Sequence, residues 1–563
     1  MSIDTLLNLV AIEMHLKRSV LAGLLLSVLV TGAYAQGVYA RGSFTSIPAG
    51  KHVNHSYYGT WNAYFAVEDG VLVYDHHNEK WLDPITASDG LLQYPVLLVW
   101  QDHGTQDVWI VTPDYVFVYD HLTGWMTNSA LPRDEKFSGV YELGTNDRKV
   151  IVTARPQDAV GSYSAIFLKS SGIFENWGPD STLDIQWNEV HKIGSVDPDL
   201  RIIYESLPLQ TVINGGFDAS GMLHLDGFPQ RSAVTVSALS GAKGAGEAFL
   251  STYGMGIFHQ RIPGGGFRPL PFGLLSPDVM CMQLDAGQLI LGGRAGLTYL
   301  DDFHVEYDEA IRDPVFDYSF ISAIDKLNSD LIIAGRGGVF KKTDGQNDWE
   351  RLITKKDLIS DRIYSVAVGM DGNLMVATER NAYLYHDSGL ILQTLFPTDL
   401  DWPVFDINYA AGKYYLSTYY GLFIFDETNL SITGKINSHG DFLSLGVHAA
   451  IDPIYESVIQ GETLWASTHR GLITMNMLEQ NGSAFLAPHA QFKPRGITLA
   501  GRRVWIGTDL GLFSFEPNAA VWRHYTRNDG LISNLVTDLA ADGNYIWVGT
   551  NLGLTRIMWQ NLY

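Results

Sequence analysis

The chain has 563 residues, of which 46% are hydrophobic and 18% charged, so it is long enough for more than one hydrophobic core and too apolar to be disordered. Lys and Arg number 38 against 61 Asp and Glu, a formal net charge of −23, which argues against nucleic acid or an anionic membrane surface as the main partner. The single cysteine, Cys281, excludes an intramolecular disulfide, and its apolar neighbours predict a buried thiol.

The first 35 residues have the pattern of a secretory signal peptide. Lys17 and Arg18 precede an apolar run, Val20–Val30, that is too short to cross a bilayer comfortably. A small-x-small cleavage site, Ala33-Tyr34-Ala35, follows it. We therefore expect cleavage near Ala35 and a location in the periplasm, at the cell surface or outside the cell. No later apolar run is long enough for a transmembrane span.

The rest of the chain is a repeat with the residues of β-strands. Its clearest copy is the last one, Ile546-Trp547-Val548-Gly549-Thr550, followed by two variable residues and Gly553-Leu554. Most copies stand 40–46 residues apart, with two spacings of 50 and 52, a period typical of propeller blades. The positions equivalent to Trp547 are, in chain order, Tyr64, Trp109, Ile151, Ile203, Phe249, Ile290, Ile332, Met375, Tyr415, Trp465 and Trp505.

Each copy predicts four short strands. In the last copy, Asn534–Ala541 predicts the first strand, and an Asp-Gly turn joins it to the second at Tyr545–Thr550. Gly553–Met558 predicts the third strand, and the fourth is clearest one copy earlier, where it begins at Trp522. Three further indoles stand at the equivalent place in their copies, and we expect all four to pack between neighbouring sheets. They are Trp81, Trp125 and Trp349.

Four antiparallel strands per copy, repeated radially, predict an all-β fold of tandem β-propellers built from about twelve four-stranded blades. Two rings are expected, with five plus seven or six plus six blades. The irregular copies at 36–275 predict a first β-propeller, and the regular copies at 276–563 predict a second, with seven blades the favoured number. A strand within Ser43–Lys51 is expected to complete the outer edge of one ring, and the sequence does not show which.

The last copies resemble the two-component regulator propeller repeat. The residues that carry the resemblance are Asp529-Gly530-Leu531, Asn534, Val536, Trp547, Gly549, Thr550, Gly553 and Leu554, and Asp89-Gly90-Leu91 before Trp109 repeats the start of the pattern. Copies between about 150 and 250 match it poorly. The resemblance implies paired propellers like those in the periplasmic sensor half of bacterial hybrid histidine kinases, which sense carbohydrate fragments.

The chain also departs from those sensors. We find no kinase, DNA-binding domain or transmembrane helix in it, so the resemblance implies the fold and a binding role but no signalling output. As a free-standing secreted form, the chain is also similar to PorZ-type surface propellers of the type IX secretion machinery, although that comparison is weaker because we see no additional C-terminal domain.

Blade geometry predicts where a ligand would bind. Because strands alternate in direction, the turn between the second and third strands lies at the same end of a blade as the connection into its first strand. The two variable residues of each Thr-x-x-Gly block should therefore ring one mouth of the channel. Aromatic side chains at these positions could stack on a ligand, and guanidinium groups could form paired hydrogen bonds to its carboxylates. The candidate ligand-binding residues are Arg294, Arg336, Glu379, Arg380, Tyr419, Tyr420, His469 and Arg470.

Motifs of catalysis are absent from the sequence. We find no nucleophile elbow, zinc-protease motif, P-loop or EF-hand loop, so we expect no catalytic residue, metal or cofactor. Two function classes stay open. We favour a non-enzymatic ligand-binding or protein-interaction scaffold at the cell envelope, whose partner is an envelope or surface protein or an oligosaccharide. The alternative is a secreted carbohydrate-active lyase or hydrolase, whose carboxylate pair cannot be chosen among 61 acids.

Export gives the first testable prediction. Protein isolated from its native host should begin near Gln36, because the signal peptidase cuts after the small-x-small site. N-terminal sequencing of the protein from fractionated cells measures this directly. A cytoplasmic protein that keeps Lys17 and Arg18 would contradict the prediction.

Overall fold

The structure, a computed structural model, describes most of the chain between residues 39 and 562. The predicted signal peptide lies outside the described residues. The described residues are 39, 42–131, 137–156, 163–179, 188–194, 222–224, 233–241, 247–261, 267–285, 287–294, 296–300, 307, 311–316, 320–327, 329–346, 348–354, 362–369, 372–386, 389–392, 395–396, 402–436, 453–479, 481–488 and 491–562.

The fold is all-β, as the repeat predicts. The described residues form 46 strands and four 3-10 helices, with no α-helix among them, and the strands make eleven antiparallel sheets. Eleven of the twelve predicted anchor positions lie on interior strands of these sheets. The twelfth, Ile203, lies outside the described residues, so the total number of blades stays a prediction.

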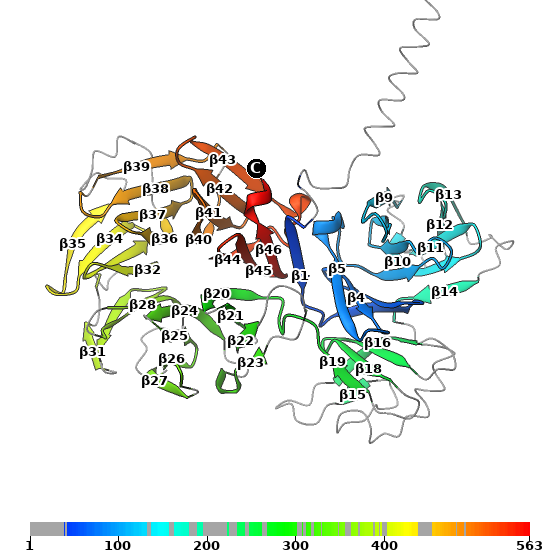
Figure 1. Ribbon diagram of the computed structural model, residues 1–563, viewed down its shortest axis with the longest axis horizontal. Helices are drawn as coiled ribbons and strands as arrows, with labels where there is room; N and C mark the ends of the chain where they lie inside the picture. Colours follow the sequence, from blue (N-terminus) through cyan, green and yellow to red (C-terminus); the bar gives the residue numbers. More distant parts are fainter. Residues whose placement is uncertain are drawn as a thin grey trace, which may run out of the picture.

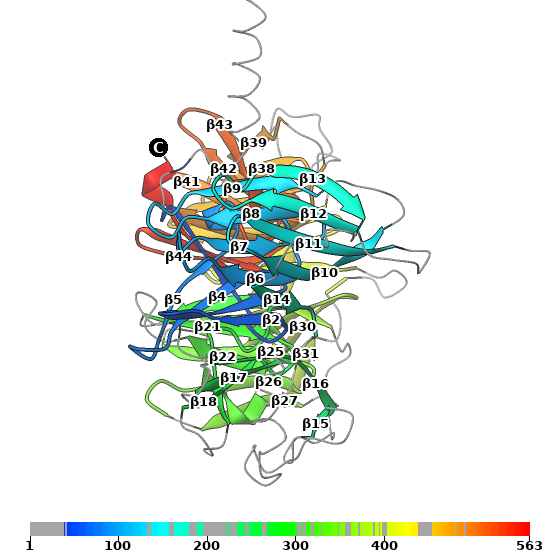
Figure 2. The same cartoon turned by 90° about the vertical axis from the view of Figure 1, so that its right-hand side faces the viewer.

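Four sheets come from the first half of the chain (Figures 1 and 2). The inner strand β2 contacts β16 on one side and β6 on the other, and β6 contacts β14. The strands are β2 (Val53–Tyr58), β3 (Asn62–Val67), β4 (Gly70–Asp75), β5 (Lys80–Ile85), β6 (Leu98–Gln101), β7 (Val108–Val111), β8 (Tyr115–Tyr119), β9 (Met126–Ala130), β10 (Phe137–Thr145), β11 (Lys149–Pro156), β12 (Tyr163–Leu168), β13 (Phe174–Pro179), β14 (Glu189–Lys192), β15 (Met222–His224), β16 (Ala233–Gly241), β17 (Ala248–Tyr253), β18 (Ile257–Gln260) and β19 (Arg268–Leu270).

Seven sheets form a series that closes on itself, the seven-sheet ring (Figure 1). Their inner strands β20, β24, β28, β32, β36, β40 and β44 contact one another in this order, and β44 contacts β20. The strands are β20 (Val279–Asp285), β21 (Gln288–Gly293), β22 (Gly296–Leu300), β23 (Ile311–Arg312), β24 (Ile321–Leu327), β25 (Asp330–Gly335), β26 (Gly338–Lys342), β27 (Trp349–Thr354), β28 (Ile363–Val368), β29 (Leu374–Thr378), β30 (Ala382–His386), β31 (Gly389–Leu392), β32 (Val404–Ala410), β33 (Lys413–Thr418), β34 (Gly421–Asp426), β35 (Ser431–Ile436), β36 (Ile454–Gln460), β37 (Thr463–Thr468), β38 (Gly471–Asn476), β39 (Asn481–Leu486), β40 (Pro494–Ala500), β41 (Arg503–Thr508), β42 (Gly511–Glu516), β43 (Val521–Tyr525), β44 (Val536–Asp542), β45 (Tyr545–Thr550) and β46 (Gly553–Met558).

The last sheet is completed by the first strand of the chain, β1 (Phe44–Pro48). It pairs antiparallel with β46, from Phe44 opposite Ile557 to Pro48 opposite Gly553. The Ser46 hydroxyl also donates to the Gly530 carbonyl at 2.8 Å. A ring-completing strand is therefore present where the sequence predicts one, and it belongs to the ring of the last copy. The division of the chain into two propellers at residue 275 stays a prediction. Strand β1 does not follow this division, because it lies before residue 275 but pairs with the last sheet of the seven-sheet ring.

The Asp-Gly-Leu motif forms a capped turn where the two sets of sheets touch. In the 3-10 helices η1 (Ala87–Asp89) and η3 (Arg527–Asp529), the final aspartate accepts the backbone N–H of Thr86 or Thr526 at 3.0 or 2.8 Å. The glycine that follows adopts a left-handed φ, of 96° after η1 and 119° after η3, which favours glycine. The two helices contact each other, so the motif joins the sets of sheets. The remaining 3-10 helices are η2 (Pro314–Phe316) and η4 (Trp559–Leu562).

Three of the four periodic indoles pack against buried aromatic rings. Trp81 lies 5.0 Å from Phe272, Trp349 4.9 Å from Phe316, and Trp522 4.7 Å from Phe515, measured between ring centroids. For Trp125 the prediction is wrong, because its side chain is 59% exposed. It stands just before β9, and the buried Met126 takes the core position that the indole was expected to fill.

Aspartates at the channel tie neighbouring inner strands together. Asp406 of β32 accepts the Ser457 N–H of β36 at 2.9 Å, and Asp538 of β44 accepts the Met282 N–H of β20 at 2.6 Å. The second bond links the last sheet of the ring to its first. Burial raises the pKa of the Asp538 carboxyl to about 7, although backbone hydrogen bonds from Leu539 and Met282 act to lower it.

Close packing at the interior glycines gives a stability prediction. A Cβ on Gly549 would lie 2.4 Å from Met282 Cε and 2.9 Å from Val279 Cγ1 of the neighbouring sheet. We expect Gly549→Val to lower the free energy of unfolding by about 1–3 kcal/mol, the usual cost of overpacking. Thermal unfolding followed by circular dichroism measures it. Gly104→Ala is the control, since only one atom lies within 4 Å of its added Cβ, and equal midpoints for both variants would contradict the packing argument.

The Asp538 carboxyl gives a pH prediction. In the unfolded chain it loses its proton near about pH 4, but in the folded protein it keeps the proton up to about pH 7. The folded state therefore loses stability relative to the unfolded state as pH rises through that window, and the loss is complete above it. Asp538→Asn keeps an acceptor for the Met282 N–H and cannot ionise.

We expect the free energy of unfolding of Asp538→Asn, relative to the wild type, to increase as pH rises from about 4 to about 7. Urea unfolding across this range measures the difference. Glu462→Gln, which removes an exposed carboxyl in the turn after β36, is the control for the loss of one charge. A difference that stays constant with pH would show that Asp538 does not titrate in this window.

Candidate functional site

The Thr-x-x-Gly turns of the seven-sheet ring have a common internal structure. In the turn after β33, the Thr418 hydroxyl donates to the Gly421 carbonyl at 2.7 Å and accepts the Tyr420 N–H at 3.1 Å. The turns after β41 and β45 repeat the first of these bonds at 2.7 and 2.8 Å. Gly421 has a φ of 118°, a left-handed value that other residues rarely adopt. Threonine and glycine thus build the turn and leave the two residues between them free to vary.

These turns lie at the same end of each sheet as the connection into its inner strand, as the sequence predicts. The Trp402 N–H donates to the Arg380 carbonyl at 2.8 Å, and Trp402 lies just before β32. Asp509 donates its N–H to Lys493, just before β40, at 3.3 Å. We call this end of the seven-sheet ring the turn face. It is formed by the turns at 293–296, 335–338, 378–382, 418–421, 468–471, 508–511 and 550–553, and by the residues just before each inner strand.

The eight predicted residues lie on this face, and none of them lines one of the pockets described among the placed residues. Arg294 pairs with Asp278 at 2.9 Å, and Glu379 pairs with Arg362 at 3.3 Å, so these charges are balanced locally. Tyr420 packs on Trp402, with 4.3 Å between ring centroids. Tyr419 is 52% exposed, and Arg336, Arg380 and Arg470 are exposed while His469 is half-buried. Their role in ligand binding stays a prediction.

A row of aromatic side chains at the channel mouth was missed by the sequence analysis. In each inner strand of the ring, the pairing with the second strand shifts its register directly after the first paired residue. Such a shift changes the direction in which the side chain at that position points. In three consecutive sheets this residue is Tyr364, Phe405 or Tyr455. The ring centroids are 6.1 Å apart from Tyr364 to Phe405 and 5.1 Å apart from Phe405 to Tyr455. We call these three residues the aromatic arc. Figure 1 shows their strands, β28, β32 and β36, side by side.

The arc extends toward the predicted turn residues. The pKa of Tyr455 is raised, first by burial and then by the nearby Tyr419 and Asp509 side chains, which places those turns beside its ring. Tyr364 is 39% exposed. The arc is visible in the sequence when the copies are aligned on their inner strands, at Ile363-Tyr364, Val404-Phe405 and Ile454-Tyr455. We aligned the copies on the second strand instead, and so missed it.

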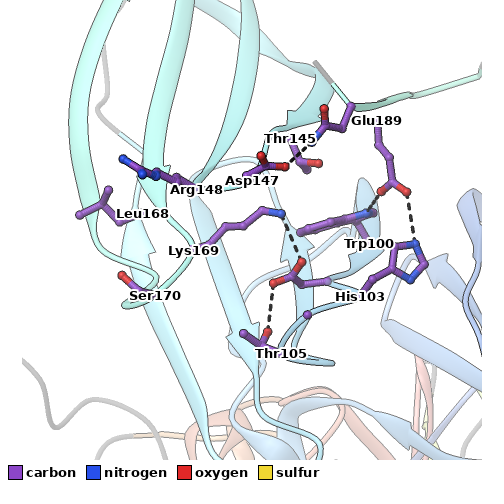
Figure 3. A pocket seen from close by; sticks show the side chains of 13 residues that line it. Trp100, His103, Thr105, Thr145, Asp147, Arg148, Leu168, Lys169, Ser170 and Glu189 are labelled. Atoms are coloured by element: carbon purple, nitrogen blue, oxygen red, sulfur yellow. Dashed lines mark hydrogen bonds and ion pairs between the residues drawn. The ribbon is translucent and has the colours of Figure 1, made fainter. Parts of the chain in front are cut away.

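A polar cleft lies in the other set of sheets (Figure 3). It has a volume of about 730 Å³, within the range of small-ligand sites. Its walls come from the turn after β6, the turn after β10, the turn after β12 and the start of β14. Figure 3 shows Lys169 beside Trp100 in the middle of the cleft, with His103 and Glu189 to one side and Arg148 to the other. No motif links these separate turns, so no sequence pattern predicts the cleft.

Most charges in the cleft are already balanced by neighbours. Lys169 pairs with Asp102 at 3.2 Å, and its ammonium lies 4.7 Å from the centroid of Trp100. Burial by itself opposes ionisation of Glu189, but the hydrogen bond from Trp100 and the nearby His191 and His103 side chains outweigh it and lower its pKa to about 2. The cleft can therefore accept hydrogen-bonding groups, but the Glu189 carboxylate is held ionised, and Asp102 is paired with Lys169.

Two searches of the part of the chain that the structure describes, one for metal-ligand clusters and one for membrane-spanning helices, found none. No group of three His, Cys, Asp or Glu side chains among these residues could hold a metal ion. Within the same residues, no helix has the length and apolarity to cross a bilayer.

Comparisons with known proteins support the fold class. No family model matches the chain, and no curated protein matches it. Among solved structures, it is similar to PorZ, described as an essential surface component of the type-IX secretion system of Porphyromonas gingivalis, with 11% identity, a TM-score of 0.62 and coverage of 92% of this chain and 87% of that one.

The extracellular domains of two putative hybrid two-component systems of B. thetaiotaomicron also match. BT4673 has 14% identity and a TM-score of 0.41 over 90% of this chain and 70% of its own. BT3049 has 14% identity and a TM-score of 0.39 over 92% of this chain and 77% of its own. At 11% identity, the similarity to PorZ shows a common fold and no more. The predicted all-β, propeller-type fold is confirmed.

Proposed function

We propose that this chain is an exported, non-enzymatic β-propeller protein that acts as a ligand-binding or protein-interaction scaffold at the cell envelope. The observation that carries the proposal is the turn face. Four of its seven turns share the same Thr and Gly contacts, and Tyr364 and Tyr419 expose large side chains to solvent on it. Exposed aromatic and arginine side chains grouped on one face are typical of interaction surfaces.

A binding role suits the channel mouth better than chemistry does. Acidic groups of the channel such as Asp406 and Asp538 serve as acceptors between strands and so have a structural task. The aromatic arc offers apolar contact area at the centre of the face, and Arg380 and Arg470 offer forked donors near its edge. Contact area surrounded by hydrogen-bonding groups is the usual composition of a binding site.

The envelope location rests on two observations. The first 35 residues have the composition of a signal peptide, and the structural neighbour with the highest similarity reported above is described as a bacterial surface component. Export into the periplasm, to the surface or into the medium would each place the turn face in contact with envelope components.

The scaffold and the enzyme predict different outcomes in one assay. Purified protein beginning at residue 36 is immobilised and incubated with neutral and acidic oligosaccharides and with solubilised envelope proteins, and both retention and product formation are measured. We expect retention without turnover. Tyr364→Ala/Tyr419→Ala should weaken retention at least about fivefold, because truncation of exposed aromatic contacts commonly costs 1 kcal/mol or more, about that factor.

Trp125→Ala is the control, since it removes an exposed aromatic ring from the other set of sheets. The proposal fails if any glycan is cleaved, which would make the protein an enzyme. Retention that is equal in the wild type and the double variant would move the binding site away from the turn face.

A further inference from the structure

Unpaired cations gather on the turn face of a strongly acidic protein. The chain carries a net charge of −23. The structure describes ion pairs for Arg294 and Arg362, but none for Arg336, Arg380 or Arg470 among the described residues. All three have exposed side chains. Three exposed guanidinium groups without a carboxylate partner attract acidic groups from outside the chain.

Two of these cations stand in the same sheets as residues of the aromatic arc. Arg380 stands in the turn after β29, in the same sheet as Tyr364, and Arg470 stands in the turn after β37, in the sheet of Tyr455. In the next sheet, Arg495 occupies the position of the arc residues, and its Nε is buried without a hydrogen-bond partner in the described structure. Cationic groups therefore flank the aromatic arc along one side of the channel mouth.

The orientation of the aromatic rings favours side chains over sugars as their partners. Phe405 and Tyr455 lie at an interplanar angle of 29° with 5.1 Å between centroids, so each covers part of the other's face. Trp402 is likewise stacked on Phe396, at 4° and 4.9 Å. A sugar ring stacks on an open aromatic face, whereas apolar and aromatic side chains also pack well against ring edges.

We propose that the turn face binds an acidic peptide segment of a partner protein, one that carries an aromatic or aliphatic side chain between its carboxylates. The apolar side chain packs on the aromatic arc, and the carboxylates reach Arg380, Arg470 and Arg495. An extended chain rises about 3.3 Å per residue, so about four residues span the arc. This assignment of a partner rests on the proposed function, because it requires the turn face to be the binding surface.

The test uses labelled peptides and purified protein beginning at residue 36. The probe is a fluorescein-labelled peptide of alternating Glu and Gly with one central Trp, and its binding is followed by fluorescence anisotropy. Matched peptides replace Glu with Lys, or Trp with Ala. We expect the acidic Trp peptide to bind, the Lys peptide not to bind, and the affinity of the acidic peptide to fall at least about fivefold when NaCl rises from about 0.15 to about 0.5 M.

Charge reversal locates the site. Arg380→Glu/Arg470→Glu should weaken binding of the acidic peptide at least about tenfold, since two attractive pairs become repulsive. Tyr364→Ala should weaken the Trp peptide more than the Ala peptide. Arg502→Glu is the control, because it reverses an exposed cation in the turn between β40 and β41, at the opposite end of the ring. Circular dichroism of each variant verifies that the fold is intact.

The inference is overturned if the Lys peptide binds as well as the Glu peptide, or if Arg380→Glu/Arg470→Glu binds like the wild type. Competition with oligogalacturonate separates this failure from failure of the proposed function. If the acidic glycan is retained and the peptide is not, and if retention is lost in Tyr364→Ala/Tyr419→Ala, the peptide is the wrong partner but the turn face is the binding surface. If neither the peptide nor any envelope component is retained, both proposals fail.

Discussion

The architecture depends on one constraint, that a four-stranded sheet buried on both faces cannot be stable alone. The interior strands are apolar on both sides, and the Ile546, Trp547 and Val548 side chains of β45 are almost completely buried. Each sheet therefore needs a neighbour on either side, and a series of sheets satisfies this requirement only by closing. In the seven-sheet ring, closure uses the Asp538 bond to the Met282 N–H between the inner strands of the last and first sheets.

Closure of the last sheet also uses the chain's first strand. Because β1 pairs with β46, residues more than 500 apart in sequence must meet before that sheet is complete. The same strand contacts β5 of the other set of sheets, and the two capped Asp-Gly-Leu turns touch nearby. The N-terminal strand is thus a structural link between the two halves of the chain, so the stability of each half depends on its junction with the other.

The repeat predicts the fold well because its signals are local. The Thr-x-x-Gly block specifies a turn through bonds among its own four residues, as in Thr418 and Gly421, and the flanking apolar run specifies a buried strand. Features that depend on distant residues were not predictable in this way. The ring to which β1 belongs is decided by its pairing with β46. The error at Trp125 is a local one, because β9 begins one residue later and Met126 occupies the core position.

The candidate site also combines features that local sequence predicts with features that depend on distant parts of the chain. The end of the sheet at which Arg380, Tyr419 and Arg470 lie follows from strand direction alone, and the structure places them there. The aromatic arc depends on a register shift in each inner strand, which no residue type announces, and on three sheets standing side by side. The cleft of Figure 3 depends on four turns from distant parts of the chain, so its residues have no common spacing.

Electrostatics on two length scales explains how an acidic protein can present a cationic binding face. At physiological ionic strength, charges separated by more than about 8 Å are largely screened, so the net charge of −23 acts weakly on a partner that is already in contact. What such a partner meets is the local set of guanidinium groups, and a partner that covers the apolar arc excludes water there and so weakens the screening. The net charge keeps copies of the chain apart, since like-charged molecules repel at long range. A distant acidic partner is repelled as well, so its attraction arises only within a few ångströms of the turn face.

Specificity in such an arrangement comes from the match between the arginines and the aromatic arc. An acidic surface without an apolar group to pack on the arc gains only exposed ion pairs, which contribute little to the binding free energy.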